Sequence, residues 1–264
     1  MGNLTFQLKS YLAYKLKAKD LHHLHSPFAF NLTKNVIYNK SQYPAYLQIN
    51  KIRKKLQNNL SIIEVHDFGA GAGDHKYIEK LKTISSVFKN NSIRQKYGEL
   101  LYRLVDHFQP HYILELGTSF GISTAYQALA APKAAFTTAE GCSGIAQKAN
   151  ENFQLLKLNN IKIEIGNFDT LLEPILEKLP QIDFAFIDGN HRKDPTIRYF
   201  MHCLKKSHND TVLIFDDIHW SPDMNEAWNF ISQHESVTLS LDLFQFGIVF
   251  FKKELSKENF IIKY

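Results

Sequence analysis

Residues 114–124 read LELGTSFGIST, a stretch that runs from an apolar strand through a glycine-containing turn into a helix. In an open parallel sheet, ligands bind outside the carboxyl ends of the strands, where such turns lie. Gly117 and Gly121 let the backbone turn tightly and approach a ligand that a Cβ atom would block. Their spacing differs from the Gly-x-Gly-x-x-Gly fingerprint of dinucleotide-binding proteins, which disfavours a pyrophosphate ligand and a nicotinamide-dependent oxidoreductase.

Outward from this turn, apolar strands alternate with helices. The expected strands are 112–116, 136–139, 161–165, 182–187 and 211–215, and the expected helices are 93–108, 122–131, 145–158, 171–179, 196–206 and 224–234. This alternation indicates a buried parallel sheet with helices on both faces. The last two strands, 237–241 and 246–251, are too close in sequence for a crossover helix, so we expect an antiparallel hairpin at the sheet edge. The predicted fold is therefore α/β, a doubly wound Rossmann-like sheet of seven strands with the last strand antiparallel.

The first 60 residues differ from the rest in charge. They contain ten Lys and Arg and one acidic residue, Asp20, so this segment carries +9 and the remainder −4 of a net +5. Leucines at every fourth position from Leu4 to Leu16 predict a helix, and Pro27 interrupts any helix that would run through it. A basic segment favours an anionic substrate, a membrane surface or nucleic acid, although a solvated helical face is the plainer interpretation. Because no RNA-binding signature or zinc finger accompanies the charge, no nucleic-acid partner is predicted.

The overall composition is that of a globular protein. Hydrophobic residues make up 44% and charged residues 22% of the 264 residues. No apolar run approaches the roughly 20 residues that span a bilayer, and the N-terminus lacks the pattern of a secretory signal. Two cysteines, Cys142 and Cys203, cannot build a disulfide framework or a cysteine-rich zinc site. We expect a reduced, cytoplasmic protein without a transmembrane segment.

A carboxylate ends the strand that follows the glycine-containing turn. This residue is Glu140, and it follows Glu115 by 25 residues. A carboxylate at this position can accept hydrogen bonds from both ribose hydroxyls of an adenosine. The turn and the acid, in this order and on these elements, predict an adenosine-containing cofactor.

A second glycine-rich stretch, DFGAGAG at residues 67–73, matches a cofactor loop even more closely as a pattern. The segment after it contains no second strand that ends in an acid, because residues 86–91 read SVFKNN and are basic and polar. A motif carries weight only in its structural context, so we interpret Gly69 to Gly73 as a turn of the N-terminal part.

Two further strand ends carry acids. Asp188 follows the strand at 182–187, and Asp216 and Asp217 follow the strand at 211–215. Neighbouring parallel strands would deliver these carboxylates to one crevice, where they repel one another unless they bind a cation or become protonated. Oxygen ligands favour a hard divalent ion such as Mg²⁺. The plainer alternative is that Asp216 or Asp217 caps the following helix.

The motif at 114–124, the acid at Glu140 and the terminal hairpin together resemble class I S-adenosylmethionine-dependent methyltransferases. The nearest resemblance is to the small-molecule O-methyltransferase branch that includes catechol O-methyltransferase and its bacterial relatives, over roughly residues 95–252. It implies that S-adenosyl-L-methionine is the cofactor, with its methionine side near Glu115 and its ribose on Glu140. The implied cofactor-binding residues are Glu115, Gly117, Thr118, Ser119, Gly121, Ser123, Glu140, Gly141, Asn167, Phe168, Asp169 and Asp188. For Asn167 and Asp169, beside the adenine, helix capping is the alternative.

The resemblance also implies a catalytic group. His191 lies three residues after Asp188, where catechol-type relatives carry a catalytic Lys, and an ordinary pKa of about 6.5 suits a general base. Cation-dependent relatives place an Asp-Asn pair where this chain has Asp216 and Asp217, which implies a metal site together with Asp188. His219 is the second candidate base, and Trp220 would wall the acceptor pocket because a flat indole suits a planar or sugar-like substrate. Both histidines could instead be ordinary hydrogen-bonding loop residues.

The predicted function is methyl transfer from S-adenosylmethionine to a hydroxyl of a small molecule, assisted by Mg²⁺ or another divalent cation. We divide the chain into a basic, mostly helical N-terminal cap at 1–92, which favours an anionic acceptor, and a methyltransferase domain at 93–264. The alternatives are a metal-independent methyltransferase with His191 as base and a non-catalytic S-adenosylmethionine-binding protein. A homodimer is one option for the oligomeric state.

Overall fold

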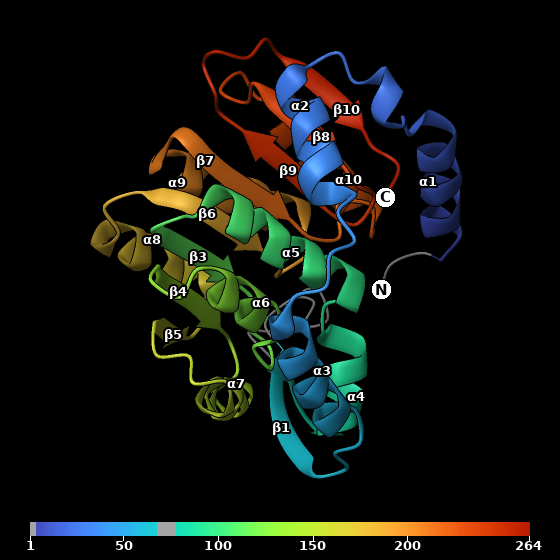
Figure 1. Ribbon diagram of the computed structural model, residues 1–264. Coiled ribbons are helices and arrows are strands. Elements are labelled where there is room, and N and C mark those ends of the chain that lie inside the picture. Colours follow the sequence, from blue (N-terminus) through green and yellow to red (C-terminus); the bar gives the residue numbers. More distant parts are fainter. Residues whose placement is uncertain (1–3, 68–77) are drawn as a thin grey trace. The chain divides into compact units, whose positions relative to one another are not determined.

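The computed structural model describes residues 4–67 and 78–264 (Figure 1). The glycine-rich stretch at 69–73 therefore lies outside the described residues. The chain forms two compact units, which we call the terminal unit (residues 1–38 and 172–264) and the central unit (residues 39–171). This grouping differs from the predicted division after residue 92, which stays a prediction. No helix in the described ranges is long and apolar enough to cross a membrane.

The central unit contains three strands in the order β3-β4-β5, and they are parallel to one another, as the sequence predicts for this region (Figure 1). They are β3 (Tyr112–Leu116), β4 (Ala135–Glu140) and β5 (Ile161–Ile165), and they are connected by α6 (Ile122–Ala130) and α7 (Ser143–Leu155). Leu116 pairs with Ala139, and Glu140 pairs with Ile165. The register therefore brings the carboxyl ends of the three strands to one edge, where the turn at 117–121 and Glu140 lie.

Four further helices and a hairpin complete the central unit. The helices are α3 (Pro44–Gln57), α4 (Ile84–Asn91), α5 (Gln95–Phe108) and the first residues of α8 (Phe168–Lys178), which continues beyond residue 171. The hairpin consists of β1 (Ile62–Asp67) and β2 (Ile78–Thr83). Strands β1 and β2 are antiparallel, from the pair Ile62 and Thr83 onward. Strand β2 was not predicted, because the charged residues of IEKLKT hide its strand pattern. Helix α5 packs through Leu100, Leu104 and their neighbours, which are fully buried at helical spacing.

The terminal unit contains five strands in the order β10-β8-β9-β7-β6. They are β6 (Ile182–Ile187), β7 (Ser207–Phe215), β8 (Leu239–Asp242), β9 (Gly247–Phe250) and β10 (Glu258–Ile261). Strand β9 is antiparallel to both β7 and β8, which confirms the predicted hairpin and the antiparallel last strand of the predicted seven.

Strand β10 corrects two expectations. It pairs in parallel with β8, so the hairpin of β8 and β9 does not form the sheet edge. Outside the β1 and β2 hairpin, the described residues form eight strands instead of seven. The short sequence ENFI begins with two polar residues, so it lacks the apolar run by which the other strands were recognised.

The helices of the terminal unit include the whole N-terminal segment up to Tyr38. They are α1 (Leu4–Lys17), the short helix η1 (Leu21–His23), α2 (Pro27–Leu32), the π-helix η2 (Thr33–Ile37), α9 (Lys193–Leu204) and α10 (Pro222–Gln233). Pro27 stands at the first position of α2, where a missing N–H costs nothing, and the Ser26 hydroxyl accepts from Ala29 N at 3.4 Å. Proline therefore separates α2 from the preceding segment, as the sequence predicts.

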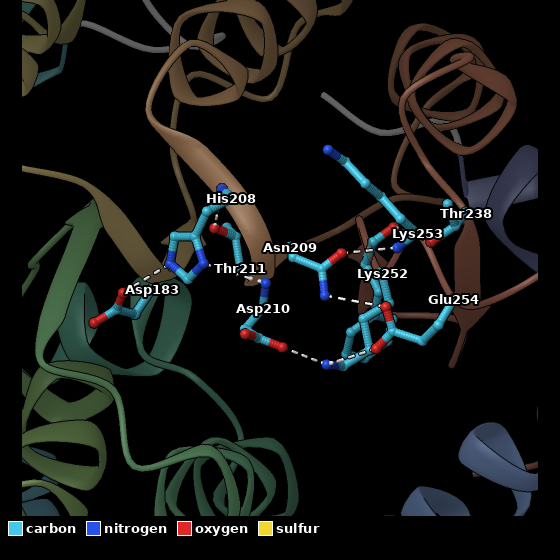
Figure 2. A network of polar contacts seen from close by, with 10 residues as sticks. Asp183, His208, Asn209, Asp210, Thr211, Thr238, Lys252, Lys253 and Glu254 are labelled. Carbon is cyan, nitrogen blue, oxygen red and sulfur yellow. Dashed lines mark hydrogen bonds and ion pairs between the residues drawn. The ribbon is translucent and has the colours of Figure 1, made fainter.

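A polar network joins the amino-terminal part of β7 to the residues after β9 (Figure 2). His208 Nε2 lies 2.8 Å from Asp183 Oδ1, and Lys252 forms an ion pair with Asp210. Asn209 Oδ1 accepts from Lys253 N at 2.9 Å. Strand β7 begins at Ser207, four residues before the predicted start. The contacts in this network stabilise the end of β7 that is opposite to Asp216.

Candidate active site

The turn after β3 adopts a left-handed backbone at three positions. The φ angles are 102° at Gly117, 47° at Ser119 and 75° at Gly121. A Cβ atom on Gly121 would lie 2.4 Å from the Phe153 ring, so only glycine fits there. Ser119 is a non-glycine residue in a strained conformation, and its buried Oγ has no hydrogen-bond partner in the described part of the chain. Strain and an unsatisfied polar atom at one residue are typical of a ligand site.

Glu140 lies directly against this turn. Its Oε2 accepts from Ser119 N at 2.8 Å, and its Oε1 accepts from Cys142 N at 2.9 Å, while Gly141 N adds a further backbone contact. Burial raises the pKa of Glu140, and these backbone donors oppose the rise. Each carboxylate oxygen has two lone pairs and so can accept a second donor. The half-buried carboxylate is thus fixed in place and still able to bind two hydroxyls.

Glu115 is placed differently, since its carboxylate is fully buried. It accepts hydrogen bonds from the Thr124 hydroxyl, from Thr138 Oγ1 at 2.7 Å and from Gln127 Nε2 at 2.9 Å. Burial outweighs these donors and raises the pKa of Glu115 from 4.5 to about 7. The geometry makes Glu115 the link between β3, β4 and the start of α6, and its predicted contact with the methionine side stays a prediction.

The remaining predicted cofactor residues of the central unit lie close to these two acids. Thr118 Oγ1 lies 2.7 Å from Thr138 Oγ1, and Ser123 is buried in the first turn of α6. Gly166 N donates to the Glu140 carbonyl at 2.9 Å, which places the loop after β5 beside Glu140. Asn167 Oδ1 accepts from Asp169 N at 2.9 Å, as the capping alternative predicts, at the start of the helix whose first residue is Phe168. This leaves an adenine contact by these residues as a prediction.

In the terminal unit, the structure brings His191 together with two of the predicted acids. His191 Nε2 lies 3.5 Å from Asp188 Oδ1, and His191 Nδ1 lies 4.0 Å from Asp217 Oδ2. The φ angles of Asn190, His191 and Asp217 are 67°, 44° and 55°. The Asn190 Oδ1 atom is buried and has no hydrogen-bond partner among the described residues. Strained non-glycine residues therefore gather at the ends of β6 and β7, as they do at active sites.

Asp216 is the most buried of the three acids. Its Oδ1 accepts from Asp217 N at 2.8 Å, and burial, followed by the charges of Asp217 and Asp188, raises its pKa well above the ordinary value. The capping alternative for Asp216 and Asp217 is wrong, because the Ser221 hydroxyl caps α10 by accepting from Met224 N.

The predicted cation site is not assembled. Within residues 4–67 and 78–264, no group of three or more His, Cys, Asp or Glu side chains is arranged to hold a metal ion. Asp188, Asp216 and Asp217 thus influence one another electrostatically without forming such a group.

His219 is held by partners on both ring nitrogens. Its Nε2 lies 2.8 Å from Asp242 Oδ2, and its Nδ1 lies 2.8 Å from Asn225 Nδ2. The ring also stacks on Phe244, with 5.4 Å between centroids. These contacts favour the alternative that His219 is an ordinary hydrogen-bonding histidine over the prediction that it is a second general base.

Trp220 is 42% exposed, and its carbonyl accepts from Gln7 Nε2 of α1 at 3.1 Å. Sequence reasoning missed the involvement of α1 and of Asp242, although Asp242 ends β8 as the other acids end their strands. A cavity of about 410 Å³ lies beside His219 and Asp242, between α1, α10, β8 and β10.

Comparison with known proteins supports the predicted resemblance. Residues 114–218 match a family model described as a methyltransferase domain. The chain is 32% identical over 130 residues to catechol O-methyltransferase from Niastella koreensis, a match that covers 48% of this chain and 58% of that protein. The chain spans about half of the length of the curated relatives it matches.

Solved structures show the same fold at low sequence identity. An O-methyltransferase from Bacillus cereus in complex with SAH is 18% identical, with a TM-score of 0.55 over 83% of this chain and 94% of that one. An SAH-bound methyltransferase from Podospora anserina is 12% identical, with a TM-score of 0.60 over 87% and 97% of the two chains. The α/β class and the resemblance to class I methyltransferases are thereby confirmed.

Proposed function

We propose that the protein is an S-adenosylmethionine-dependent O-methyltransferase that acts on a hydroxyl of a small molecule. The observation that carries the proposal is the Glu140 carboxylate, held by Ser119 N at 2.8 Å at the end of β4, within the stretch that matches a methyltransferase domain. The named relative is a catechol O-methyltransferase, which supports a small hydroxylated acceptor.

The residues of the central unit fit this cofactor. Glu140 can accept both ribose hydroxyls in addition to its backbone donors, and the unsatisfied Ser119 Oγ is available on the methionine side. Gly121 leaves room that any side chain would fill. When bound, S-adenosylmethionine supplies a methyl group on a sulfonium, which makes that carbon electrophilic.

In the terminal unit, His191 would take the proton of the acceptor hydroxyl. Asp188 and Asp217 lie 3.5 Å and 4.0 Å from its two ring nitrogens, so either carboxylate can orient the ring. Both would also stabilise the imidazolium that forms when the proton arrives. Since methyl transfer is an in-line displacement, the acceptor oxygen must also be held close to the methyl carbon. We assign this task to the loop that carries His219 and Trp220.

Of the two predicted routes, the donor geometry favours the one without a cation. The three carboxylates do not form a metal-binding group in the described part of the chain, and His191 lies between two of them. The proposed reaction therefore has no step that uses Mg²⁺. The test is the initial rate of methyl transfer with EDTA and with added Mg²⁺, which we expect to be equal.

Titration calorimetry with S-adenosylmethionine tests the cofactor site. We expect Glu140→Ala to abolish measurable binding, whereas His191→Ala should bind as the wild type does. Formation of S-adenosylhomocysteine with a panel of catechols then distinguishes an enzyme from a non-catalytic binding protein. If the protein is an enzyme, His191→Ala should still bind the cofactor but should no longer form S-adenosylhomocysteine. Absence of binding by the wild-type protein would refute the proposal.

A further inference from the structure

The outer face of α1 is apolar and exposed. Leu4, Leu8, Leu12 and Leu16 are 79%, 60%, 55% and 88% exposed, and they follow one another at one-turn spacing. At 1.5 Å per residue, this row extends for about 18 Å along the helix. Tyr11, at 40% exposed, lies beside it. An exposed apolar row of this length is typical of an interaction surface.

The opposite face of α1 already holds the helix on the terminal unit. Tyr14 is buried, and its hydroxyl donates to the Ile262 carbonyl at 2.6 Å and accepts from Tyr264 N at 2.9 Å. Gln7 adds the hydrogen bond to the Trp220 carbonyl. Because these contacts anchor the helix, the leucine row is not needed for packing within the unit and remains presented outward.

The positive charge beside the leucine row favours an anionic partner. Lys9 and Lys15 flank the row, whereas Lys17 lines the cavity on the other side of α1, and no acidic residue occurs before Asp20. Lys15 Nζ lies 5.4 Å from the centre of the Tyr11 ring, at the same outer face. If a second copy of the chain covered the row with its own α1, lysines would face lysines with no carboxylate on either helix. An anionic lipid surface instead offers both an apolar layer for leucine and negative headgroups for lysine.

We infer that α1 lies flat on anionic membranes, with the leucine row inserted among the lipids and with Lys9 and Lys15 at the headgroups. The inference is independent of the methyltransferase proposal, because it uses none of the residues assigned to cofactor or proton transfer. Each lysine near an anionic surface strengthens binding by about fivefold, and this contribution falls with added salt. Binding should therefore need both the apolar row and the charge.

The experiment is co-sedimentation of the full chain with phosphatidylcholine vesicles, with and without phosphatidylglycerol, at low and high salt. We expect binding only to the vesicles that contain phosphatidylglycerol, and weaker binding at high salt. The double variant Leu8→Gln/Leu12→Gln should bind at least about tenfold more weakly, because each buried leucine contributes a large transfer free energy. The matched control is Leu81→Gln/Leu155→Gln, which changes leucines that are 74% and 59% exposed on other elements and should bind normally.

Three results would overturn the inference. The wild-type chain could fail to bind anionic vesicles, or the Leu8→Gln/Leu12→Gln variant could bind them as well as the wild type does. Light scattering could also show a dimer that this variant converts to a monomer, in which case a second copy covers the row. Circular dichroism of both double variants establishes that they are folded, which is expected because all four side chains are exposed.

Discussion

Replacing Glu115 with glutamine should change how the stability of the folded chain depends on pH. Glutamine has nearly the shape of glutamate and cannot ionise. Its carbonyl can accept from Gln127 Nε2, and its amide can donate to the hydroxyls of Thr124 and Thr138, which accept as well as donate. The substitution therefore preserves the hydrogen-bond network and removes the buried titrating group.

The magnitude follows from the pKa of Glu115, which burial raises from 4.5 to about 7. A raised folded-state pKa means that the folded chain binds this proton more tightly than the unfolded chain does. The associated stability is fully present below pH 4.5 and is lost as the pH rises through 7. At about 1.4 kcal/mol per pKa unit, the loss from this one group is about 3 kcal/mol.

The assay is urea denaturation of the cofactor-free protein from pH 4.5 to 8. The free energy of unfolding of Glu115→Gln, minus that of the wild type, should increase by about 3 kcal/mol over this range. Glu177→Gln, at an exposed position of α8, is the control and should show no such trend. A difference between Glu115→Gln and wild type that stays constant with pH would refute the argument from burial.

Three further substitutions, the first with a matched control, test contacts that stabilise the fold. Gly121→Ala should destabilise the protein by about 2 kcal/mol or more in denaturant titration, because its Cβ would lie 2.4 Å from an aromatic ring at a φ of 75°. Gly144→Ala, whose nearest neighbour would be 3.5 Å away, should be close to neutral, and equal effects would contradict the steric argument. His219→Ala should lower the melting temperature through a loss of about 2 kcal/mol, because the buried Asp242 carboxylate loses its partner; an unchanged melting temperature would argue against this pair. Lys252→Met should cost about 1 kcal/mol by breaking the ion pair in Figure 2, and high salt should shrink the difference from wild type.

Local sequence patterns were sufficient to predict most elements of both units. Strands such as β3 and β6 are apolar at every position but one, and the predicted helices between them are found with shifted ends. Strands β2 and β10 were not predicted, because neither contains an apolar run. Each is a strand because it pairs with a neighbour, β1 for β2 and β8 for β10. A hydrogen-bonded neighbour is a long-range property that no window of a few residues contains.

Candidate residues at strand ends were accessible to the same reasoning, because the carboxyl ends of parallel strands must lie at one edge. Glu140, Asp188 and Asp216 could be named on this basis, and the family resemblance added Glu115. Their roles could not be separated, because all are carboxylates beside strand ends. Burial and hydrogen-bond partners separate them: Glu140 has backbone donors and free lone pairs, whereas Glu115 is enclosed by Thr124, Gln127 and Thr138.

Residue type and spacing thus specified the α/β class, the glycine-containing turn and the acids that follow the strands, because these depend on backbone sterics and on local periodicity. Side-chain direction and distance were decided only in three dimensions. The approach of His191 to Asp188, the His219 and Asp242 pair, and the outward leucine row of α1 all depend on how elements far apart in sequence pack together. Packing determines which polar groups are desolvated and which apolar groups remain exposed, and both quantities are properties of the assembled fold.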